Sequence, residues 1–273
     1  MQLHINKDTQ LCMSLAARPG NFGTRFHNFL YRELGLNFIY KAFTTRDLRS
    51  AIGGIRALGI RGCAISMPFK EAVIEYLDEL DASAKRIQSV NTILNNNGYL
   101  TAYNTDYTAV SKLLRSSRIA NSARFALLGS GGMAKAIACA LRDGGFANGL
   151  IVARNEVNGP ELAHQFGFQW KRDPTDEKPD LLINAMPVGM AGGAEATHLP
   201  VPENLVRSAQ FVFDVVALPP ETPLIQLARS LGKITITGSE VSVLQAVEQF
   251  VIYTGVRPAA ELIEKAAGFA RLG

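Results

Sequence analysis

Apolar residues along this chain follow two alternating periods. They recur every three to four positions over residues 22–34 and 46–58, which predicts amphipathic helices. Short apolar runs at residues 38–43 and 63–67 are typical of buried strands. A further helix is predicted over residues 69–77. This alternation of strands and helices predicts an α/β protein.

A different pattern occupies residues 89–106. Two strand-like runs are joined there by Asn97-Gly98, a dipeptide that suits the positive φ angles of a two-residue hairpin turn. We therefore expect a β-hairpin, followed by an amphipathic helix that ends near Leu114.

A second strand-helix-strand pattern begins at residue 124. An apolar strand is predicted over residues 125–128, then a helix that ends at Arg142, then a strand over residues 150–153. Further strands are predicted at residues 181–184, 211–216 and 234–237, and closing helices at 241–254 and 258–271. The pattern indicates a Rossmann-like, doubly wound parallel sheet.

Candidate cofactor chemistry lies between the first strand and the first helix of this second pattern. The segment reads Gly129-Ser130-Gly131-Gly132-Met133-Ala134. G-x-G-x-x-A in this context is typical of dinucleotide-binding sites, because the glycines allow a pyrophosphate to approach the helix N-terminus. The alternative is a tight turn that serves packing alone.

The end of the next strand bears on which cofactor binds. NAD sites place an acidic residue there to bind the ribose 2′-hydroxyl. Here the strand ends in Ala153-Arg154-Asn155, with no acid before Glu156. A guanidinium pairs with a 2′-phosphate that a carboxylate would repel, so the sequence favours NADP. Arg154 could instead be an exposed arginine at a strand end.

A nicotinamide enzyme also needs a group that handles the proton accompanying the hydride. We expect structural or surface roles for the four histidines, which are His4, His27, His164 and His198. Lys70 and Asp106 each follow a strand-like run, and together they could bond a reacting oxygen and transfer its proton. The alternative for Lys70 is an exposed lysine at the start of a helix.

Composition excludes several other classes of protein. Hydrophobic residues make up 47% and charged residues 19%, and no apolar run reaches the ~18 residues of a membrane span. Three cysteines lack metal or redox spacing, and the start lacks a signal peptide, so a reduced cytoplasmic protein is expected. The net charge of +4 includes no basic block. We therefore expect a small-molecule ligand, no nucleic acid and no metal.

Six short motifs and one glutamine carry a resemblance to a known family. They are "SMPFKEA" (66–72), "VNTI" (90–93), "NTD" (104–106), "GSGGMAKA" (129–136), "NAMPVGM" (184–190), "DVVALPPETPL" (214–224) and Gln245. In order and spacing, over nearly the whole chain, they resemble shikimate dehydrogenase. That family reduces 3-dehydroshikimate to shikimate with NADPH, in aromatic amino acid biosynthesis, and a relative handles quinate.

The resemblance implies a role for individual residues. Lys70 resembles the catalytic lysine and Asp106 its partner carboxylate. The substrate-binding positions matched are Ser66, Asn91 and Gln245. Residues 129–134 match the phosphate loop and Arg154, followed by Asn155, the 2′-phosphate site. The nicotinamide side is matched by Met186, Val215 and Gly238.

The chain departs from the family where the substrate carboxylate binds. The family has a Ser-x-Ser-Pro sequence before a His-Asn pair, whereas Asn21-Phe22-Gly23-Thr24 precedes His27-Asn28 here. A family tyrosine corresponds to Ala217, and the glycine after "NTD" is Tyr107, which is expected to re-line the substrate site. Losing two or three charge-assisted bonds, at about 1.5–3 kcal/mol each, would weaken carboxylate binding by orders of magnitude. Asn21 can still donate through its amide and Gly23 only through its backbone.

These observations lead to one expected function and two alternatives. We expect an NADP-dependent, shikimate dehydrogenase-like oxidoreductase with low activity on shikimate, acting as a monomer or homodimer. The alternatives are a dehydrogenase of quinate or another cyclic polyol or hydroxy acid, and a non-catalytic NADP-binding regulatory module. Residues 1–105, completed by helices within 239–273, are the expected substrate-binding catalytic domain, and residues 106–238 the expected NADP-binding domain.

Overall fold

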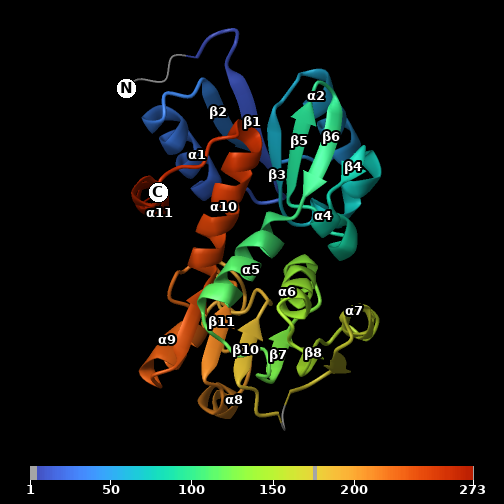
Figure 1. The fold of residues 1–273 in the computed structure, drawn as a ribbon, viewed down its shortest axis with the longest axis vertical. Helices are drawn as coiled ribbons and strands as arrows, with labels where there is room; N and C mark the ends of the chain where they lie inside the picture. The colour runs from blue at the N-terminus through green and yellow to red at the C-terminus, as the bar shows by residue number, and fades with distance from the viewer. Residues whose placement is uncertain (1–4, 175–176, 273) are drawn as a thin grey trace. The chain divides into compact units, whose positions relative to one another are not determined.

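The computed structural model describes residues 5–174 and 177–272. Its chain divides into two compact units, unit 1 (Met1–Thr105 with Val243–Gly273) and unit 2 (Asp106–Ser242). In Figure 1, unit 1 contains the elements from blue to the green strands β5 and β6, with most of α10 and the red α11, and unit 2 contains the elements from the green α5 to the orange α9. Each unit combines a six-stranded sheet with helices, which confirms the predicted α/β class.

Unit 1 is built on a mixed sheet with the strand order β2-β1-β3-β5-β6-β4. Strand β1 pairs in parallel with β2 and β3, whereas β5 pairs antiparallel with β3 and β6. The strands are β1 (Gln10–Leu15), β2 (Phe38–Phe43), β3 (Gly62–Ile65), β4 (Glu79–Leu80), β5 (Thr92–Asn96) and β6 (Tyr99–Tyr103). The predicted hairpin is confirmed, since Asn97 (φ 53°) and Gly98 (φ 91°) join β5 to β6.

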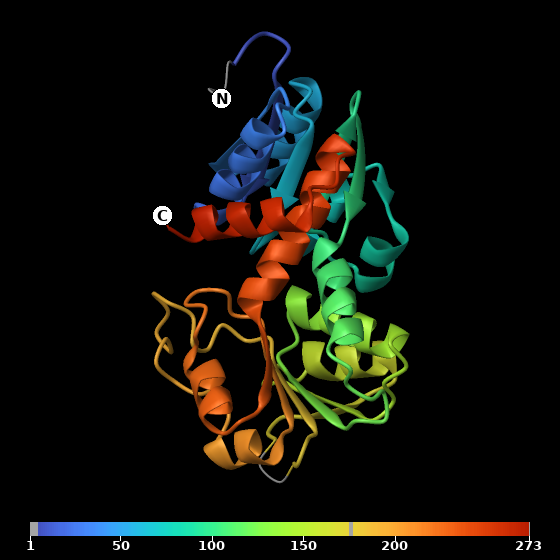
Figure 2. The ribbon, with the colours of Figure 1, turned by 60° about the vertical axis from the view of Figure 1, so that its left-hand side comes forward.

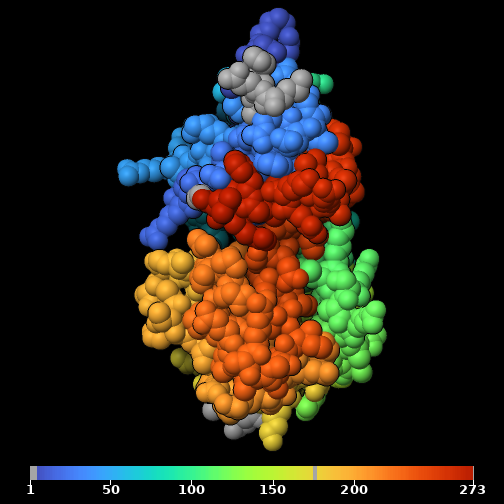
Figure 3. Space-filling model, turned by 90° about the vertical axis from the view of Figure 1, so that its left-hand side faces the viewer, coloured from blue at the N-terminus to red at the C-terminus, as the bar shows by residue number. Residues whose placement is uncertain are grey.

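The helices of unit 1 come from both ends of the chain. They are α1 (Phe22–Glu33), α2 (Leu48–Ala57), α3 (Phe69–Ala72), the 3₁₀ turn η1 (Ile74–Tyr76), α4 (Ala82–Ile87), α10 (Gly238–Thr254, from Val243 onward) and α11 (Ala260–Arg271). The helix predicted over residues 69–77 is wrong in extent, because α3 stops after one turn and a 3₁₀ turn follows it. Helix α11 lies beside α1, as Figure 2 shows. In Figure 3, the red C-terminal residues lie against the blue N-terminal ones on the surface of this unit.

An aromatic core joins α1 and α10 to the sheet of unit 1, and His27 is part of it. The side chain of His27 is fully buried and stacks on Tyr40, with ring centroids 4.5 Å apart and an interplanar angle of 6°. Phe250 and Tyr253 lie on α10 with ring centroids at 6.0 and 5.9 Å from that of His27. Burial lowers the pKa of His27 to about 3, against a smaller opposing effect of the Gln249 side chain.

Unit 2 contains an entirely parallel sheet of order β12-β11-β10-β7-β8-β9. Its strands are β7 (Phe125–Leu128), β8 (Gly149–Val152), β9 (Gln169–Lys171), β10 (Leu181–Asn184), β11 (Phe211–Asp214) and β12 (Ile234–Thr237). The strand order reverses direction between β7 and β10, which is where ligands bind in doubly wound sheets. The predicted Rossmann-like fold is confirmed.

Helices cover both faces of this parallel sheet. They are α5 (Thr105–Ser116), α6 (Gly132–Asp143), α7 (Asn158–Phe166), α8 (Glu203–Ser208) and α9 (Pro223–Ser230). Apolar residues of α8 and α9 pack on one face, while α6 and α7 contact β7 and β8. Figure 2 shows the two pairs on opposite sides of the strands. Across the described part of the chain, no helix combines the length and the apolar character needed to cross a membrane.

The first residue of α10 passes very close to the backbone that follows β11. Gly238 is buried directly after β12, and a Cβ atom placed on it would lie 2.3 Å from the carbonyl oxygen of Val215. Real Cβ atoms do not approach backbone atoms so closely, so glycine is required here to let the chain pass the end of β11.

Replacing His27 by Phe is expected to make folding less sensitive to acid. The unfolded chain binds a proton on His27 below about pH 6.5, whereas the folded protein does so only near its lowered pKa of about 3. Wild-type stability is therefore lost as the pH falls through this window. Between pH 7.5 and pH 5, the unfolding free energy of His27→Phe should shift by about 2 kcal/mol in the variant's favour, relative to wild type. Urea unfolding of both proteins at the two pH values measures this shift, and a pH-independent difference would contradict it.

Replacing Gly238 by Ala is expected to destabilise unit 2 by about 1–3 kcal/mol or more, because the new methyl group meets fixed backbone atoms. Gly268→Ala is the matched control, since Gly268 lies in α11 with no atom within 4 Å of its Cβ position. The control should gain about 0.5–1 kcal/mol from better helix propensity. Thermal unfolding of the two variants measures the predicted loss of stability in Gly238→Ala and the predicted gain in Gly268→Ala. Equal melting temperatures would show that the contact at Gly238 does not restrict the side chain.

Candidate functional site

The glycine loop of unit 2 begins where β7 ends. Gly129 has a φ of +112°, and its N–H donates to the carbonyl of Val152 at 2.8 Å. A Cβ on Gly129 would lie 3.3 Å from both the carbonyl oxygen of Ala185 and Cγ of Met186. The positive φ angle therefore favours glycine, the space left for a Cβ is tight, and the loop brings Met186 beside the predicted phosphate-binding residues.

The first turn of α6 is open to an anionic group. Gly131 is the N-cap residue, no side chain caps the helix, and no atom lies within 4 Å of the position that a Cβ on Gly131 would take. The N–H groups at a helix N-terminus lack partners within the helix and carry a partial positive charge. Ser130, Gly132 and Met133 are half-buried around this turn, and Ala134 is buried beneath it. These features fit the pyrophosphate of a dinucleotide.

The segment after β8 presents a cation. Arg154 and Asn155 are exposed, and Asn155 Oδ1 accepts hydrogen bonds from the N–H groups of Val157 (3.0 Å) and Asn158 (2.8 Å). The carboxylate of Glu156 is paired with Arg172 at 2.7 Å. Arg172 thus neutralises the carboxylate of Glu156. An unpaired carboxylate in this turn would repel a 2′-phosphate, so the ion pair favours the binding of that phosphate.

A buried polar pair, which was not predicted separately, joins the ends of β10 and β11. Asp214 is fully buried and accepts hydrogen bonds from Asn184 Nδ2 (3.0 Å), the Val216 N–H (3.0 Å) and Thr222 Oγ1 (2.6 Å). Burial raises the pKa of Asp214, and these hydrogen bonds oppose that effect. The two residues face each other in register, so an Asn and an Asp that each end a strand are a signal that could have revealed the pair.

This pair fixes the predicted nicotinamide-side residues. Asn184 Oδ1 accepts a hydrogen bond from the N–H of Met186 at 3.1 Å, and Val215 lies between two hydrogen-bonded residues, Asp214 and Val216. Gly238 touches Val215 through the close contact described above. The structure therefore brings Val215 and Gly238 together, and it holds Met186 beside the glycine loop.

In unit 1, two predicted substrate-binding residues are in direct contact. Asn91 is 1% exposed at the start of β5, and its Nδ2 donates to Oε1 of the half-buried Gln245 at 3.2 Å. These residues are 154 positions apart in the chain. The two amides meet because α10 packs across the end of the hairpin strands.

Lys70 lies at the predicted corner between a strand and a helix. It is the second residue of α3, it is half-buried, and its carbonyl accepts a hydrogen bond from the Val90 N–H at 2.8 Å. Ser66 is exposed after β3, and its N–H donates to the Leu15 carbonyl at 3.0 Å. The backbone around Lys70 is thus held by strand β1 at one end of the corner and by Val90, two residues before β5, at the other.

Asp106 occupies the first turn of α5 and is 4% exposed. A carboxylate at this position is stabilised by the partial positive charge of the helix N-terminus. The preceding residue, Thr105, donates its N–H to Asn91 Oδ1 at 2.8 Å, which fixes where α5 begins. The pairing of Asp106 with Lys70 in catalysis stays a prediction.

The altered segment before His27 forms the start of α1. Asn21 is exposed at the N-cap position, and its side chain makes no capping hydrogen bond. A Cβ on Gly23 would lie 3.5 Å from the Tyr40 hydroxyl, which is an ordinary contact distance. Packing therefore leaves room for a small side chain at position 23. Steric exclusion does not explain why this position lacks a hydroxyl.

Tyr107 is held within unit 2. Its hydroxyl donates to Asp143 Oδ2 at 2.6 Å, and burial together with this carboxylate raises the pKa of Tyr107. Asp143 is the last residue of α6, at the end opposite the glycine loop. That Tyr107 re-lines the substrate site stays a prediction.

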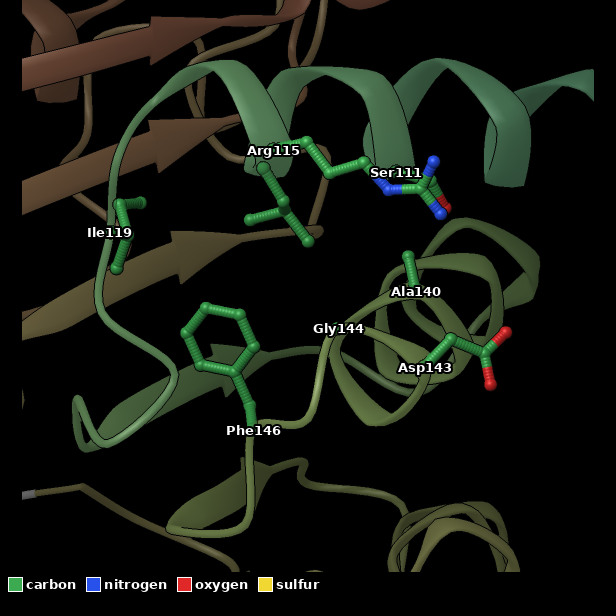
Figure 4. Close-up of a pocket in the computed structure, with 8 residues that line it drawn as sticks. Ser111, Arg115, Ile119, Ala140, Asp143, Gly144 and Phe146 are labelled. Atoms are coloured by element: carbon green, nitrogen blue, oxygen red, sulfur yellow. The ribbon is translucent and has the colours of Figure 1, made fainter.

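A pocket of about 140 Å³ opens between α5 and α6 (Figure 4). Its lining residues are Ser111, Leu114, Arg115, Ile119, Ala140, Asp143, Gly144 and Phe146. None of the predicted site residues lines this pocket, and it is separate from the glycine loop. Among the residues that the structure describes, no group of three or more His, Cys, Asp or Glu side chains could hold a metal ion.

Comparison with known proteins places these features in a family. Residues 22–93 match the family model of the shikimate dehydrogenase substrate binding domain. The chain is 54% identical to a shikimate dehydrogenase-like protein of Haemophilus influenzae over 267 residues, which cover 98% of each chain. It is 38% identical to the shikimate dehydrogenase (NADP(+)) of Pyrococcus abyssi over 253 residues, which cover 90% of this chain and 92% of that one.

Solved structures agree with this assignment. A shikimate 5-dehydrogenase-like protein, 54% identical, superposes with a TM-score of 0.92 over 98% of this chain and 100% of that one. The shikimate 5-dehydrogenase of Thermus thermophilus in complex with NADP(H) and shikimate, 28% identical, has a TM-score of 0.85 over 96% and 99% of the two chains. The chain therefore belongs to the shikimate dehydrogenase family.

Proposed function

We propose that this protein is an NADP-dependent oxidoreductase that interconverts shikimate and 3-dehydroshikimate, with low activity on shikimate. The observation that carries the proposal is the open first turn of α6 behind Gly131, together with the exposed Arg154 two residues after β8. The names of relatives support it, since the Pyrococcus abyssi protein is a shikimate dehydrogenase (NADP(+)) and shares 38% of its residues.

Each part of the cofactor site has a distinct task in this proposal. The N–H groups of the glycine loop and of the first turn of α6 bind the pyrophosphate, and Arg154 pairs with the 2′-phosphate. Met186, Val215 and Gly238 form the surface for the nicotinamide. When bound, NADP supplies or accepts the hydride.

Lys70 and Asp106 handle the proton in this proposal. Oxidation of a secondary alcohol removes a hydride from carbon and a proton from oxygen, so a group must receive that proton. The two side chains hydrogen-bond the reacting hydroxyl, take up its proton during oxidation and return it during reduction. Ser66, Asn91 and Gln245 bind the hydroxyl groups of the ring.

Low activity on shikimate follows from the start of α1. Asn21 and Gly23 stand where the family resemblance implies two hydroxyl donors for the substrate carboxylate. Each lost charge-assisted hydrogen bond costs about 1.5–3 kcal/mol of binding. Weaker binding that is equal in the ground state and the transition state raises KM and leaves kcat unchanged.

In a steady-state assay with shikimate and NADP⁺, the wild-type protein is expected to turn over with a high KM. Lys70→Ala should reduce kcat at least 100-fold, because about 3 kcal/mol of transition-state stabilisation is lost with the proton-handling amine. Lys85→Ala is the control, since Lys85 is an exposed lysine in the nearby helix α4. If the wild-type protein shows no detectable turnover of millimolar shikimate, the proposed function is wrong. If Lys70→Ala keeps a near-normal kcat, Lys70 has no catalytic role.

The altered residues before His27 also favour a second candidate, a dehydrogenase of a related cyclic hydroxy acid or polyol such as quinate. Asn21 offers an amide donor in place of a hydroxyl, and Gly23 leaves additional room. A panel of such substrates separates the candidates by kcat/KM. Tight NADPH binding without turnover of any panel member would favour the non-catalytic regulatory module instead.

Arg154→Asp is expected to reverse the cofactor preference. The new carboxylate repels a 2′-phosphate and can bind a 2′-hydroxyl, so affinity for NADPH should fall about 10–100-fold while affinity for NADH falls less or rises. Fluorescence titration with each cofactor measures this without turnover. Arg207→Asp is the control, since Arg207 is an exposed residue of α8 in the same unit. An unchanged ratio of the two affinities in Arg154→Asp would refute the role of Arg154.

A further inference from the structure

Gln249 lies one turn beyond Gln245 on α10, and none of the sequence motifs includes it. Its side chain is 3% exposed. Nε2 donates to the main-chain oxygen of Asn91 and to Oγ1 of Thr92, both at 3.2 Å. Both N–H groups of this amide are thus used on two consecutive residues of the hairpin.

The Thr92 hydroxyl links Gln249 to the Asn91 side chain through two hydrogen bonds. A hydroxyl has one proton, and Thr92 Oγ1 accepts from Gln249 while donating to Asn91 Oδ1 at 2.9 Å. Thr92 is itself fully buried, so no solvent competes for this proton.

Asn91 Oδ1 is surrounded by donors. In addition to the Thr92 hydroxyl, it accepts from Thr105 through the N–H at 2.8 Å and through Oγ1 at 3.2 Å. Rotating the Asn91 amide by half a turn would place its NH₂ group against these donors. Buried polar groups left without partners cost about 1–3 kcal/mol each, so the amide has one stable orientation.

This orientation determines what the site offers to a ligand. Asn91 Nδ2 faces Gln245 and donates one N–H to its Oε1. The Gln245 oxygen already accepts one hydrogen bond, and both residues keep N–H groups that can donate to a ligand. A ligand acceptor, such as a hydroxyl or carbonyl oxygen, fits these N–H donors.

We propose that Gln249 is a positioning residue that holds the Asn91–Gln245 amide pair with its donors turned toward the substrate. The inference rests on the proposed function only in taking Asn91 and Gln245 as substrate-binding residues. Gln249 does not touch the substrate and acts through Thr92 and the Asn91 backbone. The aromatic core around His27 surrounds the same stretch of α10, so a rigid part of unit 1 supports this contact.

Gln249→Met tests the proposal, because methionine has a similar length and no N–H donors. The KM for shikimate should rise about tenfold with little change in kcat, while the affinity for NADPH stays unchanged. Asn95→Leu is the matched control. It removes another buried amide of β5, which donates to the Ile55 carbonyl at 2.9 Å and accepts from the Gly98 N–H at 2.8 Å. The control should lose stability and keep the KM of wild type.

A second readout needs no substrate. The side-chain amide signals of Asn91 in a ¹⁵N spectrum, assigned by their loss in Asn91→Asp, should shift in Gln249→Met and stay in place in Asn95→Leu. If no form of the protein binds shikimate, a shift still supports the positioning role while the proposed function fails. Should Gln249→Met not fold, Gln249→Asn withdraws the donors by one methylene and serves in its place. Unchanged Asn91 signals, or an unchanged KM in an active, folded variant, would overturn the proposal.

Discussion

A buried side-chain amide needs partners for its oxygen and for its N–H groups, and this requirement shapes both units of the protein. In unit 1, Asn91 Oδ1 takes the Thr105 N–H and the Thr92 hydroxyl, which fixes the start of α5 and the start of β5. In unit 2, Asn184 bonds Asp214 and the Met186 N–H, which fixes the ends of β10 and β11. One predicted site residue in each unit, Gln245 and Met186, bonds such an amide, so its placement depends on satisfying buried polar groups.

The elements that could be predicted from the sequence are those with mostly apolar runs between clear breakers. The strands Phe38–Phe43, Phe125–Leu128 and Leu181–Asn184 were predicted to the residue for this reason. Strand β9 was not predicted, since Gln169-Trp170-Lys171 is short and mostly polar and becomes a strand only by pairing with β8. The helix predicted over residues 69–77 was too long, because periodicity alone does not show where a short helix tightens into a 3₁₀ turn.

The candidate site was predictable only in part, for a related physical reason. Glycines and a basic residue at a strand end have local signatures, so residues 129–134 and Arg154 could be singled out from a short stretch of sequence. Gln249 could not, because its role comes from hydrogen bonds to residues 157 and 158 positions away. The family resemblance supplied Asn91 and Gln245 but not the residues that orient them.

In the proposed function, this family member retains hydride transfer to and from the shikimate ring although its carboxylate region is changed. The most direct test is the reduction of 3-dehydroshikimate with NADPH that carries deuterium at the transferred position, followed by mass spectrometry of the product. Shikimate heavier by one mass unit is expected with the wild-type protein, and little or none with Lys70→Ala. Absence of labelled shikimate with wild type, after long incubation at high protein concentration, would contradict it.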